Sequence, residues 1–313
     1  MRKTMKYAIG IDLGGTFIKY ALIASDGMLL CGGKLPSNAD RSAEAVLEQL
    51  GLAASKCLVF ATENNLQVEG IGIGTPGIVD PQNRILLGGA ENIKGWSMVA
   101  VADVLEPQLN LPVKVCNDAN MMGLGETAFG SAQGCSDVVF ITVGTGIGGA
   151  VIIDGKLFGG YGNRGTELGH IPLIANGEQC ACGSVGCWET YASTSALVRQ
   201  FEQLAKSQTR VFNEPIDGKL IVSLYNKSDD MAVKIMEDHF FFIGRGIAGL
   251  INIFSPQRVV IGGGISEAGN FYFKKVAEMA FKYALPECSE NTEIVAAKLG
   301  NKAGCMGAAF LFL

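Results

Sequence analysis

The sequence has little histidine and no block of charge of one sign. Of its 313 residues, 2 are histidine, 25 are lysine or arginine and 30 are aspartate or glutamate, which gives a formal net charge of −5. The basic residues form no run of the kind found on nucleic-acid-binding surfaces, so no nucleic-acid partner is expected. No apolar run reaches the length that crosses a bilayer, so no membrane association is expected either.

Signals for export and for disulfide bonding are also missing. The N-terminal sequence MRKTMKYAIGIDLGG passes from a few charged residues directly into a strand pattern, without the apolar block and small-residue cleavage site of a signal peptide. This predicts a cytoplasmic protein, whose thiols stay reduced. The nine cysteines, an odd number, are therefore not expected to form a disulfide framework.

One sequence plan occurs twice. YAIGIDLGGTFIKYALIASDGMLLCGG reads as an apolar run, a glycine turn, a second run, an Asp-Gly turn and a third run, and VVFITVGTGIGGAVIIDGKLFGG repeats this order. The dipeptides Asp26-Gly27 and Asp154-Gly155 are hairpin signals. The repeat predicts two related lobes, and the alternation of strand and helix patterns elsewhere predicts the α/β class.

Helical patterns flank these repeats. SAEAVLEQLGLAASKCLVFATENN and DDMAVKIMEDHFFFIGRGIAGLINIF have the apolar spacing of helices, and ANMMGLGETAFGS predicts a helix that starts just past Asp118. The small-residue segment NKAGCMGAAFLFL is expected to form a helix that packs back onto the first lobe. We therefore predict a small lobe of residues 1–118, completed by residues 299–313, and a large lobe of residues 119–298.

Both glycine turns, DLGGT and GTGIGG, follow apolar strands. Successive backbone N–H groups in such turns form an anion-binding concavity, and glycine allows a phosphate to approach the main chain. Each turn can equally be a simple tight hairpin. GTGIGG also fits the dinucleotide fingerprint, but the strand-like AVIIDG follows it where that fingerprint requires a helix, and no P-loop motif is present.

Two such turns and a third glycine cluster at residues 262–264 indicate a nucleotide held between the lobes. Asp12, at the end of its strand, is placed to hold Mg²⁺ through water, and Thr16 and Thr145 offer hydroxyl groups. Lys19 is either a phosphate contact or a strand residue that faces solvent. The predicted nucleotide-binding residues are Asp12, Gly14, Gly15, Thr16, Lys19, Gly144, Thr145, Gly146, Gly148, Gly262, Gly263 and Gly264.

A single loop, ELGHIPLIANGEQCACGSVGCWE, collects His170, Cys180, Cys182 and Cys187. Three thiolates and one imidazole are a common ligand set for structural zinc, whereas the C-x-C-x₄-C spacing differs from paired C-x₂-C knuckles. The alternative is a chance cluster of reduced surface thiols, which would be prone to oxidation. Four protein ligands would close the site, so the zinc is predicted to be structural.

These motifs together resemble the ROK family of bacterial sugar kinases and repressors. The resemblance runs from about residue 7 to the C-terminus through DLGGT, GIGTPGIVD, NDAN, VGTGIGGAVI, ELGH and CACGSVGCWE, and is strongest to the glucokinases of the family. It implies a two-lobed, actin-like (ribonuclease H-like) kinase fold with duplicated βββαβα-type lobes and an interlobe active-site cleft. It also implies a homodimer.

The resemblance implies a function for several of these residues. Asp118 is the general base for the 6-hydroxyl of a hexose, with ATP and Mg²⁺ as the cofactors, although from the sequence alone it could be a helix N-cap. Trp96 is expected in the core. The loop that carries the cysteines is expected to serve the sugar rather than the nucleotide, because the glycine turns predicted to bind the nucleotide lie elsewhere in the sequence. The predicted sugar-binding residues are Asn92, Asn117, Asp118, Glu167, His170 and Glu189.

Two questions stay open at this stage. The resemblance favours phosphorylation of glucose to glucose 6-phosphate, but mannose, allose, N-acetylglucosamine and N-acetylmannosamine kinases share these motifs, and the phosphate donor is ATP or polyphosphate. A sugar-responsive repressor is the alternative from another class. Such repressors carry a DNA-binding domain ahead of the first glycine hairpin, for which the position of Asp12 leaves no room.

Overall fold

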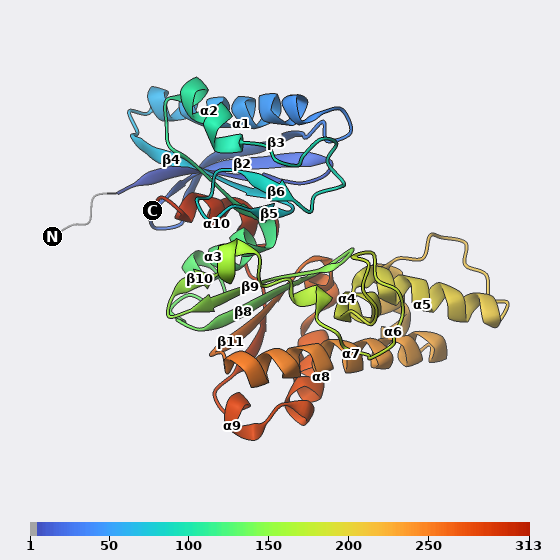
Figure 1. Cartoon of the computed structure of the whole chain (residues 1–313). Coiled ribbons are helices and arrows are strands. Elements are labelled where there is room, and N and C mark those ends of the chain that lie inside the picture. Colours follow the sequence, from blue (N-terminus) through green and yellow to red (C-terminus); the bar gives the residue numbers. More distant parts are fainter. Residues whose placement is uncertain (1–4) are drawn as a thin grey trace. The chain divides into compact units, whose positions relative to one another are not determined.

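The computed structural model describes residues 5–313, which form two compact units (Figure 1). The first unit contains the described part of Met1–Ser136 together with Ala150–Thr166 and Lys298–Leu313. The second unit contains Asp137–Gly149 and Glu167–Ala297. The lobe boundary predicted at residue 118 stays a prediction.

The first unit is built on a five-stranded sheet with the strand order β3-β2-β1-β4-β7. Strands β1, β2 and β3 form an antiparallel meander, whereas β1, β4 and β7 are parallel to one another. The Asp26-Gly27 turn joins β2 to β3, and Gly27 has a positive φ of 88°, as the hairpin signal predicted. The strands are β1 (Tyr7–Leu13), β2 (Phe17–Ala24), β3 (Leu29–Pro36), β4 (Val68–Thr75) and β7 (Val113–Asn117).

Helices cover both faces of this sheet. Helices α1 (Ala43–Glu63) and α2 (Val101–Leu109) lie on one face, and α10 (Ala303–Phe310) lies on the other, packed against α3 (Asp118–Phe129) (Figure 1). The predicted return of the C-terminal helix to the first part of the chain is confirmed. A short hairpin of β5 (Ile78–Val79) and β6 (Leu86–Gly88) completes the unit.

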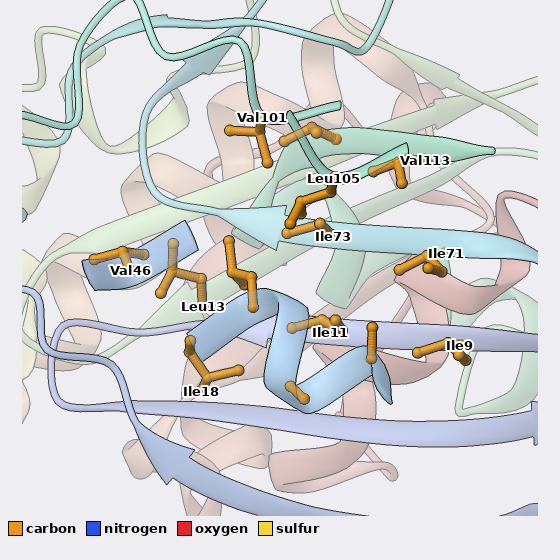
Figure 2. Close-up of a cluster of buried hydrophobic side chains, with 14 of the residues drawn as sticks. Ile9, Ile11, Leu13, Ile18, Val46, Ile71, Ile73, Val101, Leu105 and Val113 are labelled. Atoms are coloured by element: carbon orange, nitrogen blue, oxygen red, sulfur yellow. The ribbon is translucent and has the colours of Figure 1, made fainter. Parts of the chain in front are cut away.

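The period-two pattern of β1 explains this layered packing. Ile9, Ile11 and Leu13 face the α1 and α2 side, where they join a core that includes residues of β4 and both helices (Figure 2). The alternate residues face α10. A Cβ atom on Gly10 would lie 1.8 Å from the carbonyl oxygen of Cys305, so glycine is required for the close approach of this helix.

Helix α1 corrects one expectation from the sequence. It is the one helix within residues 5–313 that is long and apolar enough, by length and composition, to cross a membrane. Its buried residues repeat at helical spacing along one side and belong to the core of the first unit, as in a core helix of a globular protein. These residues are Val46, Leu50, Ala53, Ala54, Cys57 and Ala61.

The second sheet repeats the plan of the first. Its strand order β10-β9-β8-β11-β12 corresponds position by position to β3-β2-β1-β4-β7, and β8, β11 and β12 are parallel. The predicted duplication is therefore confirmed. The strands are β8 (Val138–Val143), β9 (Ile147–Ile153), β10 (Lys156–Phe158), β11 (Arg258–Gly262) and β12 (Glu293–Ala296).

The second unit is rich in helices, the longest of which is α7 (Asp230–Phe254), where the sequence predicted a long amphipathic helix. Asp229 caps it by accepting a hydrogen bond from the N–H group of Ala232. The other helices are α4 (Trp188–Ala192), α5 (Thr194–Ser207), α6 (Gly218–Asn226), α8 (Asn270–Tyr283) and α9 (Pro286–Ser289). The 3₁₀ turns of the chain are η1 (Tyr161–Asn163), η2 (Leu168–His170), η3 (Gly264–Ala268) and η4 (Gly300–Lys302).

Candidate active site and metal centre

Asp12 is a buried carboxylate near the carboxyl end of β1. Lys19, its partner across the antiparallel pair with β2, places Nζ 3.5 Å from Asp12 Oδ2 and also donates to Asn301 Oδ1 over 3.3 Å. Lys19 is thus half-exposed but ion-paired. Burial raises the pKa of the Asp12 carboxyl, and the nearby ammonium of Lys19 opposes this rise. An additional cation at Asp12 would favour its ionised form further.

The first glycine turn joins β1 to β2. The N–H group of Gly14 donates to the carbonyl of Phe17 over 3.0 Å, which closes the turn, and the residues that follow, Gly15 and Thr16, are exposed. The side chain of Asn92 lies beside this turn, because a Cβ atom on Gly15 would be 3.2 Å from Asn92 Nδ2. The turn therefore brings together a predicted phosphate contact and a predicted sugar contact within the first unit.

Asp118 and Asn117 lie where β7 passes into α3. Asn117 Oδ1 accepts a hydrogen bond from the N–H group of Asn120 over 3.1 Å, and Asn117 Nδ2 donates to the carbonyl of Gly77. Asn117 is therefore the N-cap of α3, and Asp118 is its first residue. Asp118 is half-buried, and its Oδ1 accepts from the N–H group of Ala119. The capping role considered for Asp118 belongs to its neighbour.

The parallel strands bring Asp12 and Asp118 to the same edge of the first sheet. Asp12 pairs with Gly74 of β4, and Gly74 pairs with Cys116 of β7, directly before the Asn117-Asp118 pair. Neighbouring strands lie about 4.8 Å apart, so β1, which carries Asp12, and β7, which precedes Asp118, are separated by about 10 Å. The carboxyl ends of parallel strands are the usual place for ligands in open α/β sheets.

The expected core position of Trp96 is confirmed. Its indole ring is 2% exposed, and its Nε1 group donates to Thr75 Oγ1 over 2.8 Å. The hydrogen bond fixes the end of β4 beside the Asn117-Asp118 junction. Trp96 therefore contacts Thr75, the residue of β4 that pairs with Asn117.

The second glycine turn, Gly144-Thr145-Gly146, joins β8 to β9 in the second unit. Gly144 donates to the carbonyl of Gly146 over 2.9 Å, and Thr145 is exposed at the tip. Gly148 lies in strand β9 rather than in the turn.

The third glycine cluster follows β11. Gly263 has a φ of 84°, and a Cβ atom there would lie 2.3 Å from the carbonyl oxygen of Val143 at the end of β8. The second and third glycine segments are therefore adjacent within the second unit. Gly262 ends β11, and Gly264 begins the short 3₁₀ turn η3.

The four predicted metal ligands lie in one cluster. The ligand atoms of His170, Cys180, Cys182 and Cys187 are all within 4.8 Å of one another. Cys180 Sγ lies 3.7 Å from His170 Nδ1, and the Sγ atoms of Cys182 and Cys187 are also 3.7 Å apart. Sulfurs bound to one tetrahedral zinc at about 2.3 Å would be separated by about 3.8 Å, so the spacing fits such an ion.

The acidity of these thiols also differs from that of ordinary cysteine. Burial alone would raise the pKa of Cys180, but hydrogen bonds, first among them those from the backbone and side chain of Cys182, outweigh it and lower this pKa to about 7. Burial, together with the neighbouring sulfurs, raises the pKa of Cys187 to about 12. The cluster thus favours one thiolate, the ligand form of cysteine.

The backbone around the cluster is held by its own contacts. Cys180 N–H donates to the carbonyl of Ser184 over 2.8 Å, and Gly183 N–H donates back to the carbonyl of Cys180. Gly186 has a φ of 73°, and a Cβ atom there would lie 1.8 Å from the carbonyl oxygen of Ile174. The loop is thus a folded scaffold, unlike a chance set of surface thiols.

Glu167 and Glu189, on either side of the cluster, have different surroundings. Glu167 is exposed, one residue before η2. Glu189 is half-buried in α4, and its Oε2 atom accepts a hydrogen bond from the N–H group of Ile147 over 2.8 Å. Ile147 directly follows the second glycine turn. Contrary to the expectation from the sequence, the loop is therefore not separate in space from the second glycine turn, whereas its service to the sugar stays a prediction.

A cavity of about 760 Å³ borders the third glycine segment within the second unit. A neighbouring cavity of about 400 Å³ borders Gly144 and Thr145. Gly144, Thr145 and Gly264 of this lining were predicted, whereas most of the rest comes from α5, α6 and the residues of η3 after Gly264, which carry no motif. Residues shared by the two cavities are Thr194, Asp217, Gly218 and Gly264, and apolar residues of the larger one are Val222, Ile265 and Ala268.

Comparison with known proteins finds that this chain is similar to glucokinases and to xylose repressors. The sequence profile of the ROK family matches residues 8–313. A glucokinase of Halalkalibacterium halodurans is 32% identical, over 98% of this chain and 94% of the relative. A xylose repressor of Caldicellulosiruptor bescii is 30% identical, over 98% of this chain and 78% of the relative.

A solved structure gives the same assignment for the fold. The ROK glucokinase of Streptomyces griseus, in complex with glucose and AMPPNP, superposes with a TM-score of 0.82 at 34% identity and covers 98% of this chain and 99% of that one. The fold of this chain is therefore the two-lobed, actin-like fold of ROK sugar kinases, as predicted.

Proposed function

This chain belongs to the ROK family, and we propose that it is an ATP-dependent hexose kinase that converts glucose to glucose 6-phosphate. The observation that carries the proposal is the position of Asp118. It is the first residue of α3, beside the edge of the sheet that also holds Asp12, and its neighbour Asn117 performs the capping. A glucokinase relative binds glucose and AMPPNP together, which supports both substrates.

In this proposal Asp118 is the general base. It accepts the proton of the sugar 6-hydroxyl while the hydroxyl oxygen forms a bond to the γ-phosphorus of ATP. The bond between that phosphorus and the β,γ-bridging oxygen breaks, and ADP leaves with the electron pair. Asn117, whose side chain holds the start of α3, orients Asp118 and offers its remaining N–H to a neighbouring hydroxyl.

The nucleotide is proposed to bind along the glycine turns. The N–H groups of Gly14 to Thr16 and of Gly144 to Gly146, together with residues 262–264, would contact the phosphates. The cavity of about 760 Å³ has the size of a ligand pocket and the apolar lining that suits a nucleoside. Asp12 would hold Mg²⁺ through water, and Mg²⁺ would neutralise charge on the transferred phosphoryl group.

The sugar is proposed to be oriented by Asn92, Glu167, His170 and Glu189. Ionised acceptors on a rigid scaffold orient a neutral polyol well. In His170 the Nδ1 atom faces the cysteines, so Nε2 is the nitrogen that would meet a sugar hydroxyl. Zinc bound by the four ligands would act structurally, because the ligand set fills its tetrahedron.

A panel of hexoses tests this proposal. ADP release would be measured with MgATP and, in turn, glucose, mannose, allose, N-acetylglucosamine and N-acetylmannosamine. We expect the highest kcat/KM for glucose. A higher kcat/KM for another sugar would support a kinase of that specificity. Repeating the assay with polyphosphate in place of ATP, and measuring the sugar phosphate formed, tests which phosphate donor is used. Sugar binding without turnover of any donor would favour the repressor class, to which other relatives belong.

Two further properties are proposed from the family alone. We propose that the protein is cytoplasmic and that it forms a homodimer. Light scattering coupled to size-exclusion chromatography would measure the mass directly against the chain mass of 33.0 kDa. A mass of one chain at micromolar concentration would contradict the dimer.

A further inference from the structure

The chain that follows the metal cluster is bonded to the second glycine turn at two points. Glu189 Oε2 accepts from the N–H group of Ile147 over 2.8 Å, at the end of the turn. Thr194 N–H donates to the carbonyl of Gly144 over 2.9 Å, at the start of the turn. The segment from Glu189, in helix α4, to Thr194, the first residue of α5, therefore spans the turn.

The contact at Glu189 leaves no space for a side chain at Gly146. A Cβ atom on Gly146 would lie 2.1 Å from Glu189 Oε2. The carboxylate therefore rests directly against the backbone of the turn. Gly146 does not adopt the left-handed conformation, so its lack of a side chain serves this close approach.

The link from Glu189 back to the metal cluster is short and rigid. Only Trp188 separates Glu189 from the ligand Cys187, and Trp188 is fully buried. Its Nε1 group donates to the carbonyl of Phe242 in α7 over 2.9 Å, and a Cβ atom on Gly246 of the same helix would lie 2.0 Å from the indole ring. Because Trp188 is packed tightly between them, a displacement of Cys187 would also displace Glu189.

Glu167 offers a natural comparison. It stands before His170, on the other side of the cluster, and it is exposed. Among the described residues its side chain has no hydrogen bond to either glycine turn. Two carboxylates thus flank one cluster, and only the second of them contacts the nucleotide turn.

We propose that Glu189 is a positioning residue for the nucleotide phosphates. It holds the turn from Gly144 to Ile147 in place and so connects the metal cluster to the nucleotide site. This inference rests on the proposed kinase function, because it assumes that the turn binds phosphate. It assigns to Glu189 a role in donor binding, in addition to its proposed contact with the sugar.

The test compares AMPPNP binding, with Mg²⁺ present, in wild type, Glu189→Ala, Glu189→Gln and Glu167→Ala by isothermal titration. Loss of a hydrogen bond to a charged group lowers affinity by about 10-fold or more, and we expect this loss in Glu189→Ala. Glu189→Gln should stay within about 3-fold of wild type, because its carbonyl oxygen still accepts from Ile147 N–H. Glu167→Ala should bind AMPPNP as wild type does.

Gly146→Ala gives a second test that does not remove the carboxylate. The added methyl would displace Glu189 from the turn, so AMPPNP binding should weaken as in Glu189→Ala. In the Glu189→Ala background the same change should add little, because the clash is gone. Thermal melting of each variant identifies any that fails to fold. If Gly146→Ala or Glu189→Ala does not fold, AMPPNP binding by the other variant tests the positioning role.

The outcomes separate this inference from the proposed function. Wild-type affinity for AMPPNP in Glu189→Ala, or equal losses in Glu189→Ala and Glu167→Ala, would overturn the positioning role and leave the kinase proposal standing. Additive losses from Gly146→Ala and Glu189→Ala would overturn it too. A wild-type protein that binds no AMPPNP would overturn the kinase proposal, and the positioning role with it.

Discussion

The Oδ1 atom of Asn117 accepts a hydrogen bond from the backbone N–H group of Asn120 over 3.1 Å and so closes the N-terminus of helix α3. Asp118 is therefore not the cap of this helix, and it follows β7 at the same edge of the sheet as Asp12. This arrangement has a direct kinetic consequence.

We expect Asp118→Asn to lower kcat by about 10²- to 10⁴-fold, the usual contribution of a general base, and to change the Kd for glucose little. Steady-state kinetics and glucose titration measure the two effects. Asp230→Asn is a matched control, because Asp230 is also the first residue of a helix, α7, and is exposed. Equal kcat values in the two variants would show that Asp118 acts only through its helix.

Purified protein should contain about one zinc per chain, and Cys182→Ser should lose most of it, because a hydroxyl is a far poorer ligand than a thiolate. Binding of both glucose and AMPPNP should then weaken, since the loop carries Glu189. Elemental analysis and titration check this result. Cys288→Ser is the control, since Cys288 lies outside the cluster. Active wild-type protein without zinc would contradict the metal site.

His239 makes the stability of the second unit depend on pH. It is fully buried, its Nε2 atom lies 2.8 Å from the hydroxyl of Tyr272, and burial lowers its pKa from 6.5 to about 4. The unfolded chain therefore binds a proton between pH 6.5 and 4 that the folded chain does not. This difference leaves the free energy of unfolding unchanged above pH 6.5. As the pH falls from 6.5 to about 4, it lowers the free energy of unfolding by about 3 kcal/mol.

Urea unfolding of wild type and His239→Gln at several pH values isolates this contribution. Glutamine can keep a hydrogen bond to Tyr272 but does not titrate. The difference in unfolding free energy between the two proteins should therefore shrink as the pH falls from 6.5 to 4. A difference that stays constant over this range would show that His239 does not titrate as its burial implies.

Glu126 is a second buried group with a measurable effect. It is 0% exposed, and its carboxylate accepts from the N–H and hydroxyl groups of Ser131 and from the N–H group of Leu299. Glu126→Ala leaves two backbone donors without this partner, so we expect a loss of about 2–4 kcal/mol in stability. Thermal or urea unfolding checks it, with Glu48→Ala, at an exposed site, expected to stay within about 0.5 kcal/mol of wild type.

The sequence predicted those features that depend on local pattern. The apolar run of β1, the Asp-Gly turns and the small residues of α10 each determine a strand, a hairpin or a close packing over a few residues, and all were found as expected. The metal cluster was also predictable, because three cysteines and one of two histidines in a single loop are informative by composition alone.

Features that depend on long-range packing were not predictable in this way. Glu189 and Ile147 are 42 residues apart, and only the fold brings the carboxylate to the turn. Both Asn and Asp cap helices well, so the choice between Asn117 and Asp118 depends on where the backbone passes from the extended strand into the helix, and Asn117 is still extended. In the cavity beside Gly264, that glycine belongs to a predicted cluster, but the lining from α6 has no sequence pattern that marks it.

The most direct measurement of the proposed function is ³¹P NMR of the reaction of this protein with MgATP and glucose. We predict ADP and a single phosphate ester on the 6-oxygen of glucose, and no ester from 6-deoxyglucose. Asp118→Asn should form the ester at least about 100-fold more slowly, because a general base contributes roughly 10²- to 10⁴-fold to the rate. Glucose that binds while ATP stays intact, or an ester on another oxygen, would contradict the account.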